Sequence, residues 1–256
     1  MTGGTTRTPA ASTRRVGKVA LPVVPAVEPL PAGPFSEWLQ TTRSARDGEC
    51  GVAVPCGECN ACCRSSLFIH IRPEETDSLS HIDPRLLFPA PGAPPGHQLL
   101  GYGKRGHCPM LKDSGCSIYE HRPRTCRDFD CRTLAATTLV LDHAQQAIAE
   151  QAQRWRFEYP RDEDDRQHVA VRATAAFLLE RGPELLPGLL PSHPLQLAML
   201  AVCVYDVLYA LGDGSQQTRP PDDELARAIL TAMARGEDDE TPARAISVKR
   251  GPGDQP

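Results

Sequence analysis

The sequence predicts a mainly α-helical fold in which helices pack as a small bundle against an irregular, cysteine-rich module. Nine of the ten cysteines fall within the 82 residues from Cys50 to Cys131, a stretch with few large apolar side chains. Residues 134–236 instead repeat apolar side chains at helical spacing. The chain also holds 25 prolines and 20 glycines, which indicates much irregular structure between these elements.

We expect the first segment, residues 1–47, to be disordered. It is rich in Thr, Pro, Ala and Gly, so it cannot bury enough surface to offset the entropy of ordering it. The aromatic residues of Phe35–Leu39 could dock on the folded part, although a fragment that lies on the surface without function is the preferred interpretation. Residues 237–256 are expected to form a disordered tail.

The second segment, residues 48–133, is the cysteine-rich module. Branched and aromatic side chains in Leu67–Ile71 predict a short strand. Proline followed by acids at Pro73–Glu75 predicts the start of a short helix that runs to Leu79, and the acids are explained by electrostatics at that helix start. Prolines and glycines in residues 83–97 predict a long loop. A module this poor in core residues usually needs an additional covalent or metal link.

The third segment, residues 134–236, is predicted to be helical. Its first helix would run from Leu134 to about Tyr159, because Leu134, Leu141, Ile148 and Trp155 recur every seven residues on one stripe. Three further helices are predicted from apolar periodicity and from the glycines that follow them, over Asp165–Arg181, Leu195–Leu211 and Asp222–Arg235.

Composition bears on partners and location. The net charge is only -4, without the basic excess that nucleic-acid binding usually needs, so we expect no nucleic-acid partner. The most apolar segment, Leu195–Leu211, is short for a membrane span and contains Asp206. No apolar run of signal-peptide length follows the N-terminal basic residues. We therefore expect a cytoplasmic protein without membrane contact, in which thiols stay reduced and can act as ligands.

Eight cysteines are the candidate metal ligands: Cys56, Cys59, Cys62, Cys63, Cys108, Cys116, Cys126 and Cys131. Along the sequence they form two groups of four. Spacing of the Cys-x-x-Cys type lets a turn bring two sulfurs onto one ion, and its repetition resembles the beginning of a bacterial ferredoxin run. Adjacent side chains rarely point at one tetrahedral centre, so Cys62 and Cys63 are expected to serve different ions or to bridge two.

The metal and the grouping stay open at this point. Eight thiolates could complete two mononuclear sites or one polynuclear cluster, with zinc or iron as the metal and an iron–sulfur cluster as one form of the latter. Basic residues lie near the cysteines in sequence, where they either offset the thiolate charge or are solvated surface. These are Arg64, Lys104, Arg105, Lys112, Arg122, Arg124, Arg127 and Arg132.

The remaining candidates have weaker claims. Cys203, in an apolar helix, is interpreted as a core residue, and Cys50 lies just outside the motif. His107 and His121 neighbour ligand cysteines and could replace one, although a solvated loop histidine is the preferred interpretation for each. His70 and His81 have weaker claims still. We recognise no catalytic motif in the chain.

The residues from Cys56 to Phe129 resemble a known family, the zinc- or iron-chelating CxxCxxCC cysteine-cluster family (YkgJ-like). The resemblance is carried by Cys-x-x-Cys-x-x-Cys-Cys-Arg at Cys56–Arg64, Cys-Pro-x-Leu at Cys108–Leu111, and Cys-x-Ile-Tyr-x-x-Arg-Pro-x-x-Cys-Arg-x-Phe at Cys116–Phe129. Asn60 stands where the usual pattern has Gly, and Asn also tolerates a left-handed backbone. The resemblance leaves the N-terminal and helical parts unmatched and implies chelation of zinc or iron.

The sequence therefore predicts a metal-binding protein whose ion is structural or serves binding, delivery or sensing. The alternative is a zinc- or iron–sulfur-dependent protein-modifying enzyme, since some relatives of the family sit in a flagellin lysine N-methylase. A catalytic zinc keeps one position open, and eight thiolates favour closed sites instead. A thiol redox switch is a weaker third hypothesis. The metal ion is the expected partner, and the sequence identifies no protein partner.

Overall fold

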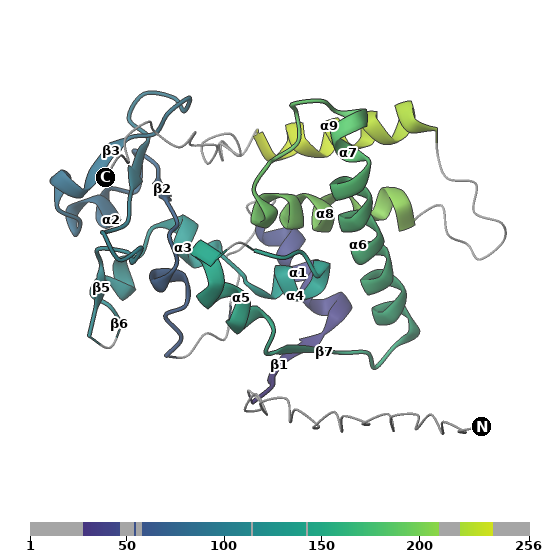
Figure 1. The fold of residues 1–256 in the computed structure, drawn as a ribbon, viewed down its shortest axis with the longest axis horizontal. Coiled ribbons are helices and arrows are strands. Elements are labelled where there is room, and N and C mark those ends of the chain that lie inside the picture. Colours follow the sequence, from purple (N-terminus) through teal and green to yellow (C-terminus); the bar gives the residue numbers. More distant parts are fainter. Residues whose placement is uncertain are drawn as a thin grey trace, which may run out of the picture.

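The structure, a computed structural model, describes residues 28–46, 54, 58–113, 115–141, 143–209 and 221–237. Figure 1 shows two lobes. We call residues 58–128 the cysteine lobe and residues 28–46 with 129–237 the helical lobe. The sequence places the cysteine lobe between two parts of the helical lobe, so both of its ends connect to the same neighbour.

The cysteine lobe consists of short strands, turns and two short helices. A three-stranded antiparallel sheet has the order β2-β4-β3, and β5 pairs with β6 in a hairpin. The elements are η1 (Cys62–Arg64), β2 (Ile69–Ile71), α2 (Thr76–Ser80), η2 (Pro84–Leu86), β3 (Leu87–Pro89), β4 (Gln98–Leu100), β5 (Leu111–Lys112), β6 (Gly115–Cys116), η3 (Tyr119–His121) and α3 (Arg124–Asp128). The buried core of this lobe is small, comprising Ile71, Ile82, Leu100, Met110 and Ile118.

The helical lobe is built around α6 and α8, which cross and pack against each other, with α9 beside α8 (Figure 1). Its elements are β1 (Leu30–Pro34), α1 (Phe35–Arg46), α4 (Arg132–Thr137), η4 (His143–Gln145), α5 (Gln146–Ala152), β7 (Trp155–Glu158), α6 (Asp162–Glu180), α7 (Gly182–Leu185), α8 (Pro194–Tyr209) and α9 (Asp222–Glu237). Ala175, Leu178, Leu200, Val204 and Leu225 are among the buried residues where α6, α8 and α9 meet.

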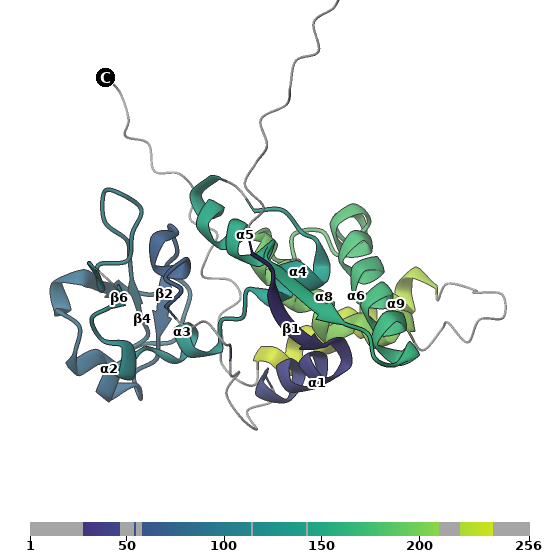
Figure 2. The ribbon, with the colours of Figure 1, turned by 90° about the horizontal axis from the view of Figure 1, so that it is seen from below.

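The N-terminal segment departs from its prediction over residues 28–46. These residues form β1 and α1, with β1 in parallel pairing with β7; Figure 2 shows β1 and α1 lying along the helical lobe. The side chains of Phe35, Trp38 and Leu39 are at most 4% exposed and pack against α6 and α8. The composition of residues 1–47 hid this contact, because three large apolar side chains on one helical turn suffice to dock α1.

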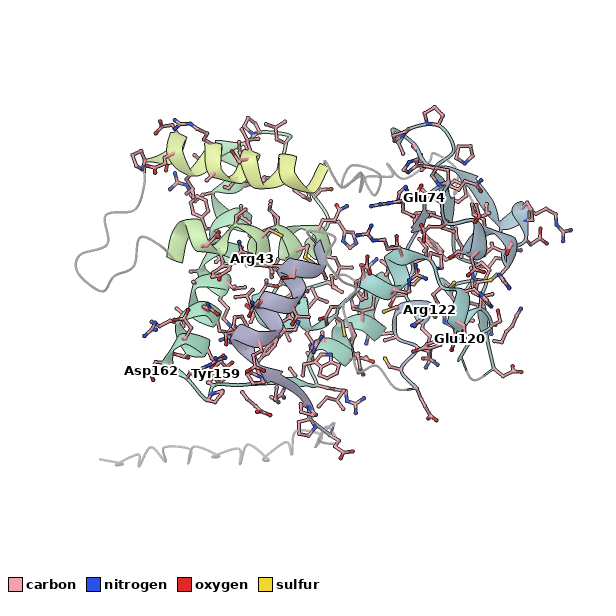
Figure 3. All side chains as sticks on the ribbon, turned by 180° about the vertical axis from the view of Figure 1, so that it is seen from behind. Arg43, Glu74, Glu120, Arg122, Tyr159 and Asp162 are labelled. Atoms are coloured by element: carbon pink, nitrogen blue, oxygen red, sulfur yellow. The ribbon has the colours of Figure 1, made fainter. Side chains whose placement is uncertain are left out.

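Polar contacts fix α1 in place. The N–H and Oγ of Ser36 both donate to the buried carboxylate of Asp164, in the first turn of α6. Burial acts to raise the pKa of Asp164, but these hydrogen bonds and those from Arg161 outweigh it and lower the pKa to about 2. On the surface, Arg43 of α1, labelled in Figure 3, forms an ion pair of 2.8 Å with Asp206 of α8.

The single helix predicted from Leu134 to Tyr159 is wrong. This stretch forms α4, η4, α5 and the strand β7. The helix ends because Thr138 adopts a left-handed backbone with φ of 57° and its N–H bonds the carbonyl of Leu134. Leu134, Leu141, Ile148 and Trp155 are nevertheless all buried in one cluster, so the seven-residue stripe identified the buried side chains but not the secondary structure.

The other predicted elements agree more closely. The last three predicted helices correspond to α6, α8 and α9, of which α6 begins three residues before the predicted start at Asp165. The strand predicted over Leu67–Ile71 is β2, and the short helix is α2. The predicted loop over 83–97 contains β3, which pairs with β4. Residues 1–27 and the predicted tail, apart from Glu237 at the end of α9, lie outside the described residues. No helix in the described part is long and apolar enough to cross a membrane.

Candidate metal centre

Four thiols come together in the cysteine lobe from four separate elements. Cys63 lies in η1, Cys108 precedes β5, Cys116 ends β6 and Cys126 lies in α3. The backbone N–H of Cys108 donates to the carbonyl of Cys63 over 2.8 Å, and their side chains share a hydrogen bond. We call Cys63, Cys108, Cys116 and Cys126 the first thiol group.

A tight turn presents Cys108 to this group. Pro109 follows Cys108, and the N–H of Leu111 closes the turn on the Cys108 carbonyl over 3.0 Å. The backbone N–H groups of Met110 and Leu111 also hydrogen-bond the Cys108 side chain. The chain then reverses through the β5–β6 hairpin, which pairs Leu111 with Cys116. The Cys-Pro-x-Leu motif therefore supplies backbone donors to a sulfur and returns the chain to bring in a second one.

The thiols of this group ionise unequally. The hydrogen bond from Cys63 is the main cause that lowers the pKa of Cys108 to about 7, with help from the backbone N–H groups and against the effect of burial. The same bond, together with burial and the nearby thiols, raises the pKa of Cys63. Burial raises the pKa of Cys126 to about 12. The thiolate of Cys108 thus forms readily near neutral pH, and a bound cation would be needed to ionise Cys63 and Cys126.

Glu75 holds the Cys126 segment in place. Its carboxylate accepts hydrogen bonds from the backbone N–H of Arg72, over 2.8 Å, and from that of Arg124 at the start of α3. Thr125 adds a hydrogen bond from its Oγ1 to the carbonyl of His70, over 2.7 Å. The sequence explained Glu75 only by electrostatics at the start of α2. In the structure, its carboxylate also joins the chain before α2 to the start of α3, because it accepts hydrogen bonds from the backbone of both.

A second set of thiols lies toward the helical lobe. Cys131 is 6% exposed, and its sulfur accepts a hydrogen bond from Nε1 of Trp155 over 3.1 Å. Cys62 packs against the same hydrophobic cluster as Cys131, and η1 contacts α5. Cys59 is partly exposed, and Cys56 and Cys50 lie outside the described residues. Although Cys62 and Cys63 are adjacent in sequence, Cys63 therefore lies with Cys108, whereas Cys62 packs with the cluster of Cys131.

A buried polar network fixes the backbone on either side of Cys131. Asp130 accepts a hydrogen bond from Nε1 of Trp38 over 2.8 Å and forms an ion pair of 2.8 Å with Arg132. The Arg132 guanidinium also lies 5.9 Å from the ring of Trp155. The sequence prediction missed these supporting residues, since Trp38 belongs to the segment expected to be disordered. An Asp-Cys-Arg run in a motif otherwise poor in acids is the signal that could have indicated them.

The basic residues divide between the two roles left open by the sequence. Arg122, labelled in Figure 3, is close enough to Cys126 to oppose the rise in its pKa, and its guanidinium lies 3.5 Å from the centre of the Tyr119 ring. Arg124 pairs with Asp128 within α3, whereas Arg132 is committed to the buried Asp130. Of these three arginines, only Arg122 acts on the thiols directly.

The histidines have other partners than the thiols. His107 lines a surface cleft of about 440 Å³ beside Cys108, together with Lys104, Arg105 and Lys112. The rings of His70 and His97 share a hydrogen bond of 2.8 Å. His81 and His121 meet at Asp77, and this is the one group of three His, Cys, Asp or Glu side chains in the described chain whose ligand atoms lie within 4.8 Å of one another.

Comparison with known families identifies one family over the cysteine-rich part of the chain. Residues 55–151 match the CxxCxxCC family, described as a "Putative zinc- or iron-chelating domain". The matched stretch contains all eight candidate cysteines and extends through α4 to α5. No curated protein and no solved structure matches the chain. The family resemblance read from the motifs is thereby confirmed, and the matched domain is one for zinc or iron.

Proposed function

We propose that this protein chelates zinc or iron through all eight cysteines, arranged as two groups of four. The first thiol group is Cys63, Cys108, Cys116 and Cys126, and the second is Cys56, Cys59, Cys62 and Cys131. The observation that carries the proposal is the first group itself, in which thiols from four separate elements lie close enough to shift one another's pKa. Soft thiolate ligands in sets of four are the donors that zinc and iron–sulfur clusters use.

The chemistry of the donors fits a cation. A cluster of thiolates is costly without positive charge, and the raised pKa values of Cys63 and Cys126 express that cost in the absence of a metal. Binding of the ion would replace the thiol protons and remove the cost. Backbone N–H groups already hydrogen-bond Cys108, and such donors in the outer shell support thiolate ligands.

The wide spacing of the sulfurs favours an iron–sulfur cluster over a single zinc ion in the first thiol group. Zinc–sulfur bonds of about 2.3 Å in a tetrahedron place the sulfurs roughly 3.8 Å apart. Among the seven described cysteines of the module, no three sulfurs lie within 4.8 Å of one another. A zinc ion would therefore require the first thiol group to contract, whereas a larger cluster accommodates a wider set.

We propose binding rather than catalysis as the role of the metal. Two sets of four thiolates fill every position of a tetrahedral ion and leave none for a substrate. The small core of the cysteine lobe gives the ion a structural task as well. Structural zinc contributes about 10–16 kcal/mol in zinc-finger peptides, which is comparable to the whole stability of a typical domain, about 5–15 kcal/mol.

The test is metal analysis of the full chain purified without oxygen. Elemental analysis, sulfide determination and an absorption spectrum distinguish zinc from iron and from an iron–sulfur cluster. Cys116→Ser should remove the metal bound by the first thiol group. Cys203→Ala, which alters a cysteine outside both groups, should leave the metal content unchanged. A folded protein without metal, or a Cys116→Ser variant with the full metal content, would overturn the proposal.

A further inference from the structure

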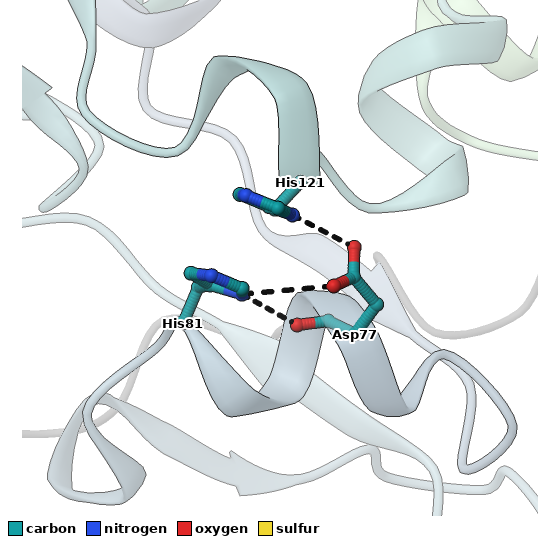
Figure 4. Close-up of side chains that lie close together, drawn as sticks. All are labelled: Asp77, His81 and His121. Carbon is teal, nitrogen blue, oxygen red and sulfur yellow. Dashed lines mark hydrogen bonds and ion pairs between the residues drawn. The ribbon is translucent and has the colours of Figure 1, made fainter.

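Asp77, His81 and His121 converge on the surface of the cysteine lobe (Figure 4). Nδ1 of His121 lies 2.9 Å from one carboxylate oxygen of Asp77, and Nδ1 of His81 lies 3.9 Å from the other. The two imidazole rings stack with their centres 3.6 Å apart and an angle of 7° between their planes. The proposed metal binding by the eight cysteines uses none of these three residues.

The backbone under this group is held by the core of the lobe. Asp77 lies in α2 and His81 follows it, with the N–H of His81 bonded to the Ser78 carbonyl over 3.2 Å. His121 lies in η3, and its N–H bonds the Ile118 carbonyl over 2.9 Å. Ile118 is buried in the same cluster as Ile82, the neighbour of His81. Two segments about forty residues apart thus place imidazoles on one carboxylate as a consequence of core packing.

We propose that Asp77, His81 and His121 bind one divalent transition-metal ion at a site separate from the thiol groups. Two imidazole nitrogens with one carboxylate oxygen suit ions such as Zn²⁺, Fe²⁺, Co²⁺ and Ni²⁺, whereas Ca²⁺ and Mg²⁺ prefer all-oxygen sites. The side chains are 67%, 40% and 41% exposed, respectively. Water would therefore complete the coordination, which sets this site apart from closed thiolate sites.

Ion binding requires only local rearrangement. Nδ1 of His81 now lies 2.9 Å from the backbone carbonyl of Asp77 and 3.0 Å from Oγ of Ser80. A cation would replace the protons of these hydrogen bonds and of the bond between His121 and Asp77. The stacked rings hold their nitrogen lone pairs nearly parallel, so each ring must tilt toward the ion. Their exposure leaves room for that rotation about χ2.

The charges around the group bear on a bound cation. The hydrogen bond from His121 is the main cause that lowers the pKa of Asp77, with smaller effects from His81 and Arg127. The lowered pKa favours the carboxylate form of Asp77, which is the form that binds a cation. The positive charge of Arg127 opposes the ion.

The experiment uses the full chain with its tight sites filled by Zn²⁺ and free metal removed. Calorimetric titration with further Zn²⁺ at pH 7.5 should show one additional ion per chain. His81→Asn and His121→Asn should each weaken this binding at least ~10-fold, and His143→Asn, at an exposed histidine elsewhere in the chain, should leave it unchanged. No additional ion in the wild type, or binding as tight as that of the wild type in both histidine variants, would overturn the inference.

A second readout separates this site from the thiol groups. Long-range ¹H–¹⁵N NMR spectra of the histidine rings report coordination of imidazole nitrogen directly. The signals of His81 and His121 should change on addition of Zn²⁺ whatever the cysteines hold. If these signals stay constant when Zn²⁺ is added, the inference fails, even if the thiol groups bind metal. If they change in a chain whose thiols bind no metal, the inference holds although the proposed function fails.

Discussion

Nε1 of Trp155 donates a hydrogen bond to the sulfur of Cys131 over 3.1 Å, and both side chains are buried. Trp155 begins β7, the strand that pairs with β1. A candidate metal ligand is therefore in direct contact with the sheet that orders the N-terminal part of the helical lobe. Metal binding at the second thiol group and the stability of the helical lobe should depend on each other through this contact.

Removal of the indole donor should weaken the second group. Trp155→Phe keeps most of the ring but loses the N–H, and hydrogen bonds to charged groups contribute about 1.5–3 kcal/mol. We expect Zn²⁺ or iron to be lost from one site at about 10-fold lower chelator concentration. Tyr205→Phe is the control, because the Tyr205 hydroxyl interacts with Arg43 and not with the residues around Cys131. It should leave that chelator concentration unchanged, and equal metal loss in both variants would contradict the prediction.

Cys62→Ser and Cys63→Ser should remove metal from different sites. These residues are adjacent, yet Cys62 packs with the cluster of Cys131 and Cys63 bonds Cys108. In elemental analysis, Cys63→Ser combined with Cys116→Ser should lose no more metal than either change alone. Cys62→Ser combined with Cys116→Ser should lose the metal of both groups. Equal losses in the two double variants would mean that all eight cysteines hold a single centre.

Cys108 should be more reactive than Cys126 in metal-free protein. Its pKa of about 7 leaves a large thiolate fraction near pH 7.5, whereas the pKa of Cys126 is about 12. Brief treatment with iodoacetamide, followed by peptide mass spectrometry, should find Cys108 modified well before Cys126. Metal loading should protect both. Faster modification of Cys126 would show that the hydrogen bond from Cys63 does not control ionisation.

The helical lobe should lose stability in mild acid because of His168. Burial is the main cause that lowers the pKa of this histidine to about 4; its ring lies 2.6 Å from the Tyr159 hydroxyl and 3.1 Å from the Ala136 carbonyl. In the unfolded chain the pKa of a histidine is near 6.5, so the unfolded chain binds a proton more readily than the folded one. Protonation of His168 therefore leaves the free energy of unfolding unchanged above about pH 6.5 and lowers it as the pH drops toward 4. The loss should be on the order of 2 kcal/mol.

Urea unfolding at pH 7.5 and pH 4.5 measures this effect. His168→Gln should be less stable than the wild type at pH 7.5 but should lose less between the two pH values. His143→Asn, at an exposed histidine, should retain the wild-type dependence. If His168→Gln loses as much free energy of unfolding between the two pH values as the wild type does, groups other than His168 cause the acid sensitivity.

The sequence predicted the residues of the fold better than their arrangement. Local signals were sufficient for α6, α8 and α9, where periodicity and terminal residues coincide. They failed at Trp155, because parallel pairing with β1 draws residues 155–158 into a strand, and that pairing joins segments over 120 residues apart. They failed at Phe35 and Trp38 for the same reason, since burial of α1 depends on helices that come much later in the chain.

The candidate site shows the same division. Motif spacing was enough to select the eight candidate cysteines, because ligand spacing is local, and the adjacency of Cys62 and Cys63 led us to expect that they diverge. It did not indicate that Cys63 joins Cys108, which depends on the turn at η1 and the hydrogen bond between their backbones. The meeting of His81 and His121 at Asp77 was equally hidden, because it results from the packing of α2 against η3 rather than from any sequence pattern.

The insertion of the cysteine lobe between α1 and α4 has a consequence for synthesis on the ribosome. Phe35 and Trp38 leave the exit tunnel long before Val171 and Val202, the residues that cover them in the native core. Between these events the whole cysteine lobe emerges. The nascent chain therefore carries an uncovered apolar helix past a set of reduced thiols, and contacts of such high sequence separation form slowly. Metal capture by the cysteine lobe could precede completion of the helical lobe and shorten the interval in which α1 is exposed to aggregation.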